Sequence, residues 1–474
     1  MNKSMLCAGL LALVAAQFAN ADDCLWTGGG TNSNWSTSAN WNCSGAHAVP
    51  QDGDNLSFPD GVPRLTNNND IAKLIAAKLL IAGPVNLSGL TIGLSDGIAA
   101  TVPLASASPV VNLGIVLETN AQTFQCSGTH KALTLSGTIN LNSQALTLDS
   151  ACNIFLTGKI TGTGSITKIG ATTAFLEGAT SNYAGVTAIN VGKLRLVSSA
   201  GLGASGPGNE TVVANGAALE IEDVATAEDV TLSGTGISSQ GALVGAAGNN
   251  TLTGAITLAA DSTINAATGT KLTIEGAIGG GSVSLTKIGA GTLVLQGLNT
   301  YNGSAIANNG WLEVNGTVVV AAANSGAALA GNGVATSSLA IQSGAAFSPG
   351  TAAGANTGSF DATNVSWIGG GSMVFQLGPD SAHSDHLVAA SNFNRGGTGF
   401  EFQFSDGATP PVPGVVYTLV TFVSTSFAAG DFSFTYTGTG PGSALAGLFA
   451  MTPTELQFTP IVVISDLIFR DGLE

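Results

Sequence analysis

Residues 284–314 read SLTKIGAGTLVLQGLNTYNGSAIANNGWLEV, and a second version, SITKIGATTAFLEGATSNYAGVTAINVGKLRLV, occupies residues 165–197. Both copies contain short runs in which apolar and small residues alternate, separated by Gly and Asn. Alternation with a period of two predicts half-buried strands, and Gly and Asn predict turns with unusual backbone angles. Neither copy contains histidine or cysteine, so we expect the repeat to serve architecture rather than chemistry.

Short alternating strands of this kind continue through residues 61–354, for example ALTLSGTINL and TLTGAITL. Recurrence of one small unit indicates a solenoid, in which each coil stacks on the previous one. The sequence therefore predicts an all-β fold, a right-handed parallel β-helix with about 14 coils of roughly 20 residues each. An array of antiparallel sandwiches or barrels is the alternative.

The two ends of this segment differ from its middle. Residues 22–60 contain Trp26, Trp35 and Trp41, which either plug the open end of a layered core or stack on sugars. We favour a Trp-rich cap. Residues 355–460 hold longer, more aromatic strands and predict a smaller antiparallel β unit at the C-terminal end, followed by a tail at 461–474.

The composition limits the classes of partner. Only 9% of the residues are charged, and the formal net charge is −16 with 13 basic residues in 474. Because neutralising phosphates requires clustered Lys and Arg, we expect no nucleic-acid partner.

The first residues are typical of a secretory signal peptide, residues 1–21. Lys3 precedes an apolar stretch, and Ala19-Asn20-Ala21 forms a cleavage site of the A-x-A type. We expect an exported protein that is extracellular or on the outer cell surface, with the periplasm as the alternative. No later run of ~20 apolar residues occurs, so no transmembrane helix is expected.

Four cysteines remain after the signal peptide: Cys24, Cys43, Cys126 and Cys152. An even number in an exported chain predicts two disulfides. Among three possible connectivities we expect local pairing, Cys24–Cys43 and Cys126–Cys152. Metal binding is less favoured, because the cysteines form no C-x-x-C pair.

The duplicated stretch resembles the autotransporter-associated β-strand repeat found in passenger regions of bacterial surface proteins. Matching positions in the later copy are Lys287, Gly289, Gly291, Leu293, Leu295, Tyr301 and Gly303, and those in the earlier copy are Lys168, Gly170, Tyr183 and Gly185. The resemblance implies an exported β-helix from a Gram-negative bacterium, in which these positions are structural.

One departure from that family concerns export. A self-secreting autotransporter ends in a membrane barrel built from many alternating strands of ~10 residues, and the segment after residue 354 does not offer a dozen of them. A separate translocator is therefore expected. The final LIFRDGLE resembles a short C-terminal motif of exported proteins from some Gram-negative bacteria, and a frayed last strand is the alternative.

Alternation raises a question about Lys287. Counting from Leu285 places Lys287 on the inward side of the strand, where an ammonium group would be buried. We therefore expect a bend or bulge at this position.

Candidate chemistry is sparse. The cluster His383-Ser384-Asp385-His386 could hold a cation, but alternation would separate the two histidines. Oxygen-rich turns at Asp52-Gly53-Asp54 and Asn67–Asp70 suit calcium less well than turn formation. The densest acidic group comprises Glu220, Glu222, Asp223, Glu228 and Asp229, which favours an exposed turn over a paired-carboxylate active site.

These observations predict a surface-displayed or secreted rod with a structural or adhesive role, no cofactor and no catalytic site. Its ligand would be an unidentified surface or glycan. A carbohydrate-active enzyme using Glu222 or Asp223, and a glycan-binding module using Trp35, are the alternatives.

Overall fold

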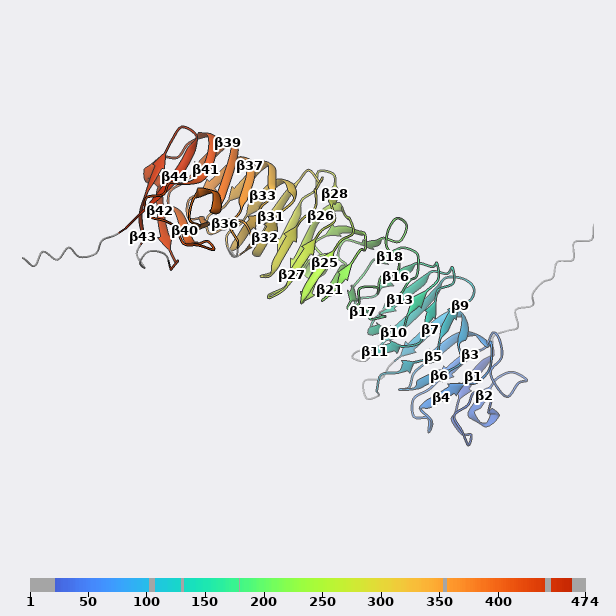
Figure 1. Ribbon diagram of the computed structural model, residues 1–474. Coiled ribbons are helices and arrows are strands. Elements are labelled where there is room, and N and C mark those ends of the chain that lie inside the picture. The colour runs from blue at the N-terminus through green and yellow to red at the C-terminus, as the bar shows by residue number, and fades with distance from the viewer. Residues whose placement is uncertain are drawn as a thin grey trace, which may run out of the picture.

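The computed structural model describes residues 22–101, 107–128, 132–178, 180–352, 356–439 and 445–462. It is an elongated rod whose strands lie across the long axis, with the N-terminal coils at one end and the C-terminal coils at the other (Figure 1). The predicted signal peptide and the last 12 residues of the predicted tail lie outside the described residues.

Each coil contributes strands to three stacks, which we call faces 1, 2 and 3. Face 1 holds β1 (Asp23–Trp26), β3 (Asn55–Phe58), β5 (Ile75–Ile81), β7 (Ile92–Thr101), β10 (Gln122–Ser127), β13 (Leu146–Ser150), β16 (Ile166–Ile169), β18 (Thr187–Ile189), β20 (Thr211–Val213), β23 (Val230–Gly234), β26 (Ile256–Ala266), β28 (Ile278–Gly280), β33 (Thr317–Ala323), β35 (Val334–Ile341), β37 (Ser359–Ile368), β39 (His386–Gly396) and β41 (Tyr417–Thr425).

Face 2 follows face 1 along the chain. It holds β4 (Thr66–Asn69), β6 (Asn86–Gly89), β8 (Val110–Val111), β11 (Ala132–Leu135), β14 (Asn153–Leu156), β17 (Thr173–Leu176), β19 (Lys193–Leu196), β21 (Ala218–Glu222), β24 (Leu243–Ala247), β29 (Leu285–Ile288) and β31 (Ser304–Ala307). Strands β26, β33, β35, β37, β39 and β41 bend from face 1 onto face 2, and their second halves continue this stack.

Face 3 comes last in each coil. It holds β9 (Ile115–Leu117), β12 (Ile139–Asn140), β15 (Ile160–Thr161), β22 (Ala225–Thr226), β25 (Asn249–Leu252), β27 (Lys271–Ile274), β30 (Thr292–Leu295), β32 (Gly310–Val314), β34 (Ala327–Gly331), β36 (Ala346–Pro349), β38 (Ser372–Leu377), β40 (Phe400–Asp406) and β42 (Phe432–Tyr436). The first halves of β5 and β7 also belong to this stack, because they pair with each other and β7 pairs with β9. Between β15 and β22 this side of the coil is formed by loops.

Parallel register places like residues above one another and so builds the core. On face 3, for example, one inward column carries Leu272, Leu293, Leu312, Leu329 and Phe347 in successive coils, and all of them are buried. Outward positions alternate with these along each strand. The hydrophobic effect thus acts along the whole rod rather than in one central core.

The predicted parallel β-solenoid is confirmed, with about 14 turns. Parallel pairing also continues beyond residue 354, through β37–β39–β41 and β38–β40–β42. The predicted antiparallel unit is smaller than 355–460, because among the described residues after 354 the strands pair antiparallel only in β41–β44 (Glu455–Val462) and β43 (Leu445–Met451)–β44. The aromatic residues of these strands do not alter the strand direction. They alter only the side chains of the core, where Met373, Phe402 and Phe434 continue the leucine column.

The Trp-rich segment closes the N-terminal end. Strand β2 (Trp41–Cys43) pairs antiparallel with β1 and follows the short 3-10 helix η1 (Ser38–Asn40). Trp26, Trp35 and Trp41 pack with Phe58 at ring distances of 5.1 to 6.5 Å. Each indole N–H donates to an oxygen acceptor at 2.9 Å, so the three rings serve packing and hydrogen bonding within the cap.

The remaining short elements are 3-10 turns: η2 (Ile237–Ser239), η4 (Ser381–His383) and η5 (Ala429–Asp431). Within the described ranges, no helix has the length and hydrophobicity needed to cross a bilayer.

The two repeat copies lie on different faces of the rod. In the earlier copy, the strand with Lys168 is β16 on face 1, and the leucine strand is β17 on face 2. In the later copy, the strand with Lys287 is β29 on face 2, and the leucine strand is β30 on face 3. The stack that contains β17 runs through β19, β21, β24 and β26 to β29, which fixes this offset.

Candidate functional site

The repeat lysines are buried inside the rod. Lys168 stacks between Leu148 and Ile189, and Lys287 stacks between Ile264 and Ala307. The strand around Lys287 keeps its alternation and continuous register, so the expected bend or bulge is wrong. The chain turns immediately after the strand instead, and the aliphatic part of the lysine fills the column while its ammonium reaches that turn.

Each ammonium is held by three carbonyl groups. Lys168 Nζ donates to Ile169 O at 2.8 Å, Gly170 O at 2.7 Å and Val191 O at 3.0 Å. Lys287 Nζ donates to Ile288 O at 3.0 Å, Asn309 O at 2.9 Å and Gly289 O. Because an ammonium has three N–H donors, every donor is used. The acceptors come from two successive coils, so each lysine joins one coil to the next.

Glycines shape these carbonyl sites. Gly170 and Gly192 have φ of 81° and 74°, and Gly289 and Gly310 have φ of 79° and 63°, a region that favours glycine. A Cβ on Gly192 would also lie 2.8 Å from Lys168 Nζ. Burial lowers the pKa of both lysines to about 8. Both amines are buried and all of their N–H donors are hydrogen-bonded. They are therefore structural, and their geometry does not suit a nucleophile.

The repeat tyrosines differ between the copies. Tyr183 is buried, and its hydroxyl lies 2.6 Å from Thr187 Oγ1. Thr211 occupies the position above Thr187 and donates to Glu228 Oε1 at 2.7 Å. Tyr301 is equally buried, but its hydroxyl has no hydrogen-bond partner among the described residues. Burial raises the pKa of both phenols, and it raises the pKa of Glu228 to about 8.

The predicted cysteine pairs are confirmed. Cys24–Cys43 and Cys126–Cys152 are disulfide-bonded, with Cα–Cα distances of 4.0 and 5.3 Å. The first ties β2 to β1 within the N-terminal cap. The second joins neighbouring coils at the turn between faces 1 and 2, since Cys126 lies in β10 and Cys152 follows β13, the strand that pairs with β10.

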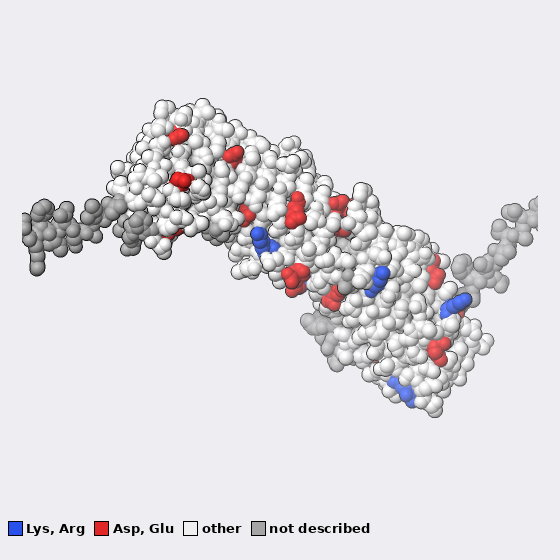
Figure 2. Space-filling model, in the orientation of Figure 1, with Lys and Arg blue, Asp and Glu red and all other residues white. Residues whose placement is uncertain are grey.

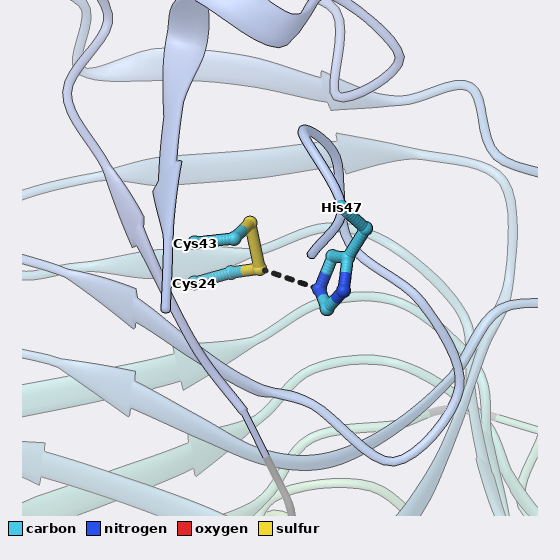
Figure 3. A group of neighbouring side chains, drawn as sticks. All are labelled: Cys24, Cys43 and His47. Carbon is cyan, nitrogen blue, oxygen red and sulfur yellow. Dashed lines mark hydrogen bonds between the residues drawn. A yellow bond between two sulfur atoms is a disulfide. The ribbon is translucent and has the colours of Figure 1, made fainter. Parts of the chain in front are cut away.

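The N-terminal disulfide lies beside a histidine and two carboxylates. His47 Nε2 is 3.6 Å from Cys24 Sγ (Figure 3) and 2.8 Å from Asp54 Oδ2, while Nδ1 is 3.9 Å from Asp22 Oδ2. The two carboxylates approach different ring nitrogens, and one ion cannot bind both nitrogens of a single imidazole. The disulfide also withholds the thiolates that metals prefer. This cluster therefore pins the loop that carries His47 onto β1.

The side chains of the candidate cation site at His383–His386 do not point toward a common position. His383 is exposed and lies 2.7 Å from Asp380 Oδ1. Asp385 is buried and accepts from the backbone N–H groups of Gly358 and Gln376, both at 2.7 Å. Burial raises the pKa of Asp385 to about 7 and lowers that of His386. Asp385 thus binds backbone amides, and the three side chains share no ligand position.

The oxygen-rich turns are likewise engaged in local hydrogen bonds. Asp52 accepts from Ile75 N, Asn67 accepts from the Trp35 indole, and Asp70 accepts from Ser36. Asp54 accepts from Gln51 N at 2.8 Å. These groups hold turns and the N-terminal cap together, which agrees with their interpretation as turn-forming residues rather than calcium ligands.

The acidic group near residue 220 separates into two parts. Glu220 and Glu222 point outward from β21 and pair with Lys193 and Arg195. Glu228 instead points inward to Thr211. Glu220 and Glu222 are thus neutralised by neighbouring cations. The Arg195 guanidinium also lies 5.8 Å from the centroid of the Phe175 ring, and this ring stacks on Phe155 at a centroid distance of 4.3 Å. The five acidic residues therefore do not meet around one substrate position.

The tryptophan that is accessible is not one that the sequence suggested. Trp26, Trp35, Trp41 and Trp367 are buried, whereas Trp311 on β32 remains partly exposed. Trp311 lines a groove of 760 Å³ on face 3, together with Ala328, Ala346, Glu401 and Gln403. The available signal was its position in GWLEV, where alternation with the inward Leu312 and Val314 places Trp311 outward.

Comparison with known proteins gave no assignment. No family model matches the chain, and no curated protein matches it either.

Proposed function

We propose that the protein is an exported rod that is displayed on the outer surface of a Gram-negative cell or secreted, with a structural and adhesive role and no catalysis. One observation carries this proposal: the buried polar groups of the repeats serve contacts between coils. Lys168 and Lys287, with three carbonyl acceptors each, are the clearest case. Selection for a long, stable stack suits a protein that presents its outer surface at a distance.

The outer surface supports the same proposal. Charged side chains are sparse and scattered over the face shown in Figure 2, in keeping with a charged content of 9%. A surface of small, polar and uncharged residues stays soluble and offers flat strands for contact. The signal peptide supplies the first export step.

Surface display can be tested by protease shaving of intact cells. Proteinase K should release fragments of the rod from untreated cells, while a periplasmic marker protein stays intact. Mass spectrometry of the released protein should place its N-terminus at Asp22. Cleavage only after permeabilisation of the outer membrane would assign the rod to the periplasm instead.

Adhesion needs its own measurement. A strain that lacks the gene should lose attachment to surfaces or cell–cell aggregation, and expression of the full chain should restore it. Unchanged attachment and aggregation, together with normal display, would leave a purely structural role.

A further inference from the structure

The groove on face 3 follows from one outward column of side chains. From β32 to β42 the column carries Trp311, Ala328, Ala346, Ser372, Glu401 and Ser433 in successive coils. A bulky aromatic group thus stands at one end, three small residues form the floor, and polar groups stand at the other end. At a strand spacing of about 4.8 Å, the column spans roughly 24 Å along the rod.

A ladder of glycines forms the edge of the same groove. Gly326, Gly344, Gly370 and Gly399 lie in successive coils and have φ between 75° and 85°. The N–H groups of Gly326, Gly344 and Gly370 each donate to the carbonyl of the glycine in the next coil, at 2.7 to 2.9 Å. Because these corners carry no side chains, the hollow stays open over four coils, and the backbone at its edge is already hydrogen-bonded.

Trp311 gives the groove an aromatic surface on face 3, at a position where the earlier copy has no aromatic residue. Its counterpart in the earlier copy is Lys193, which pairs with Glu220. Ala328 lies directly above Trp311, so the indole is not covered by its neighbour on the column. A partly exposed indole beside a floor of small residues can receive a flat, weakly apolar ring.

The charges of the groove restrict the ligand. The described residues that line it include Glu401 but no Lys, Arg or His, so an anionic polymer would meet repulsion without compensation. Asn309, Gln403 and Ser433 supply uncharged hydrogen-bonding groups. An aromatic ring with amide, hydroxyl and carboxylate groups matches a sugar, which has an apolar C–H face and hydroxyl groups around its edge.

We propose that this groove binds an uncharged oligosaccharide, with one sugar ring on Trp311 and hydroxyl groups on Asn309, Glu401 and Gln403. The biological meaning of such binding, attachment to a glycan surface, rests on the proposed adhesive function. The binding itself does not depend on where the protein is displayed.

The test uses the purified full chain without its signal peptide. Calorimetry and tryptophan fluorescence are measured with neutral gluco-, manno- and N-acetylglucosamine oligosaccharides, with an anionic oligogalacturonide and with an apolar peptide for comparison. At least one neutral oligosaccharide should bind and change the fluorescence, since Trp311 is the accessible tryptophan. Binding of none of them, or preference for the oligogalacturonide or the peptide, would overturn the proposal.

Variants locate the site. Trp311→Ala should weaken binding by about tenfold or more, as expected for removal of an aromatic anchor, and Trp311→Phe should lose less. Ala346→Gln, which fills the floor, should weaken binding to a similar degree. Lys193→Ala, at the matching position of the other copy, is the control and should bind normally. Equal affinity in Trp311→Ala and Lys193→Ala would place any binding elsewhere.

The two proposals fail in different ways. Loss of binding in Trp311→Ala with normal release by protease shaving supports the groove and the display together. Binding by a rod that is found in the periplasm would keep the groove and refute surface display. A displayed rod without oligosaccharide binding would refute the groove alone.

Discussion

The two repeat copies compare the same sequence motif on different faces of one rod. The lysine strand lies on face 1 in the earlier copy and on face 2 in the later one, yet each lysine meets the same set of three carbonyls, from the next residue, the residue after it and the following coil. The motif therefore encodes a corner between two strands and its link to the next coil. It does not encode a particular face.

The differences between the copies lie around this shared corner. In the earlier copy the tyrosine hydroxyl meets Thr187, and in the later copy the matching position is Ala305, which leaves Tyr301 without a partner among the described residues. Outside, the earlier copy carries Lys193 and the later one Trp311. The corner is thus constant, while the interior polar groups and the outer surface vary.

Replacing either repeat lysine should have the largest effect. Lys168→Met or Lys287→Met keeps the length of the side chain but removes the ammonium that donates to three buried carbonyls, at an expected cost of about 3 kcal/mol. Urea unfolding followed by circular dichroism measures it.

Lys271→Met, at an exposed lysine of β27, is the matched control and should change stability by less than about 0.5 kcal/mol. If the repeat lysines were dispensable, all three variants would unfold alike.

The pH dependence of the free energy of unfolding should come next, through Glu228, which lies beside the earlier copy. Burial raises the pKa of Glu228 from 4.5 to about 8, so the folded chain holds this proton more tightly than the unfolded chain. Its contribution is complete below pH 4.5 and is lost as the pH rises to 8.

Glu228→Gln should remove that part of the dependence, and melting temperatures from pH 4.5 to 8.5 measure it. Asp385, whose pKa is raised to about 7, changes stability in the same direction in both proteins, so the difference between them isolates Glu228. Parallel curves for the two proteins would count against a buried, protonated Glu228.

Exchanging the tyrosine partners should have a smaller effect. Thr187→Ala removes the partner of the Tyr183 hydroxyl and should cost about 1 to 2 kcal/mol. Ala305→Thr offers Tyr301 the missing partner and should stabilise by up to about 1 kcal/mol.

Unfolding midpoints of both variants and of the double variant measure these effects, which should add because the sites are far apart in the rod. Destabilisation by Ala305→Thr would show that face 2 has no room for the hydroxyl that face 1 accommodates.

The outward position occupied by Lys193 in the earlier copy and by Trp311 in the later copy should matter least for stability. Lys193→Ala breaks a partly exposed ion pair with Glu220, and about 0.5 kcal/mol is expected. Trp311→Ala, at the matching outward position, should also leave the melting temperature within a few degrees. A large loss in either case would mean that the outer column contributes to coil stacking.

Much of the architecture could be predicted from the sequence, because strand alternation and cysteine spacing are local. The β-solenoid and the disulfides Cys24–Cys43 and Cys126–Cys152 followed from them. Lys287 was placed inward by alternation, but the sequence does not display carbonyl groups, so the stabilising partners of the ammonium could not be foreseen.

Other features depend on how far the chain travels between coils. The offset of the two copies by one face depends on the path of the chain through the coils between them, which local alternation does not specify. The groove at Trp311 needs Ala328, Ala346 and Glu401 to stack in register, although they are widely spaced in sequence. Phe-rich strands after residue 354 were interpreted as antiparallel, since aromatic content does not specify strand direction.

Hydrogen exchange with mass spectrometry, applied to Lys168→Met and Lys287→Met, tests the corner most directly. Lys168→Met should lose protection in residues 166–172 and 187–192, while residues 285–312 remain as in the wild type. Lys287→Met should lose protection in residues 285–291 and 304–312 and leave the earlier copy unchanged. Wild-type protection at both corners in both variants would contradict the claim that each lysine joins two successive coils.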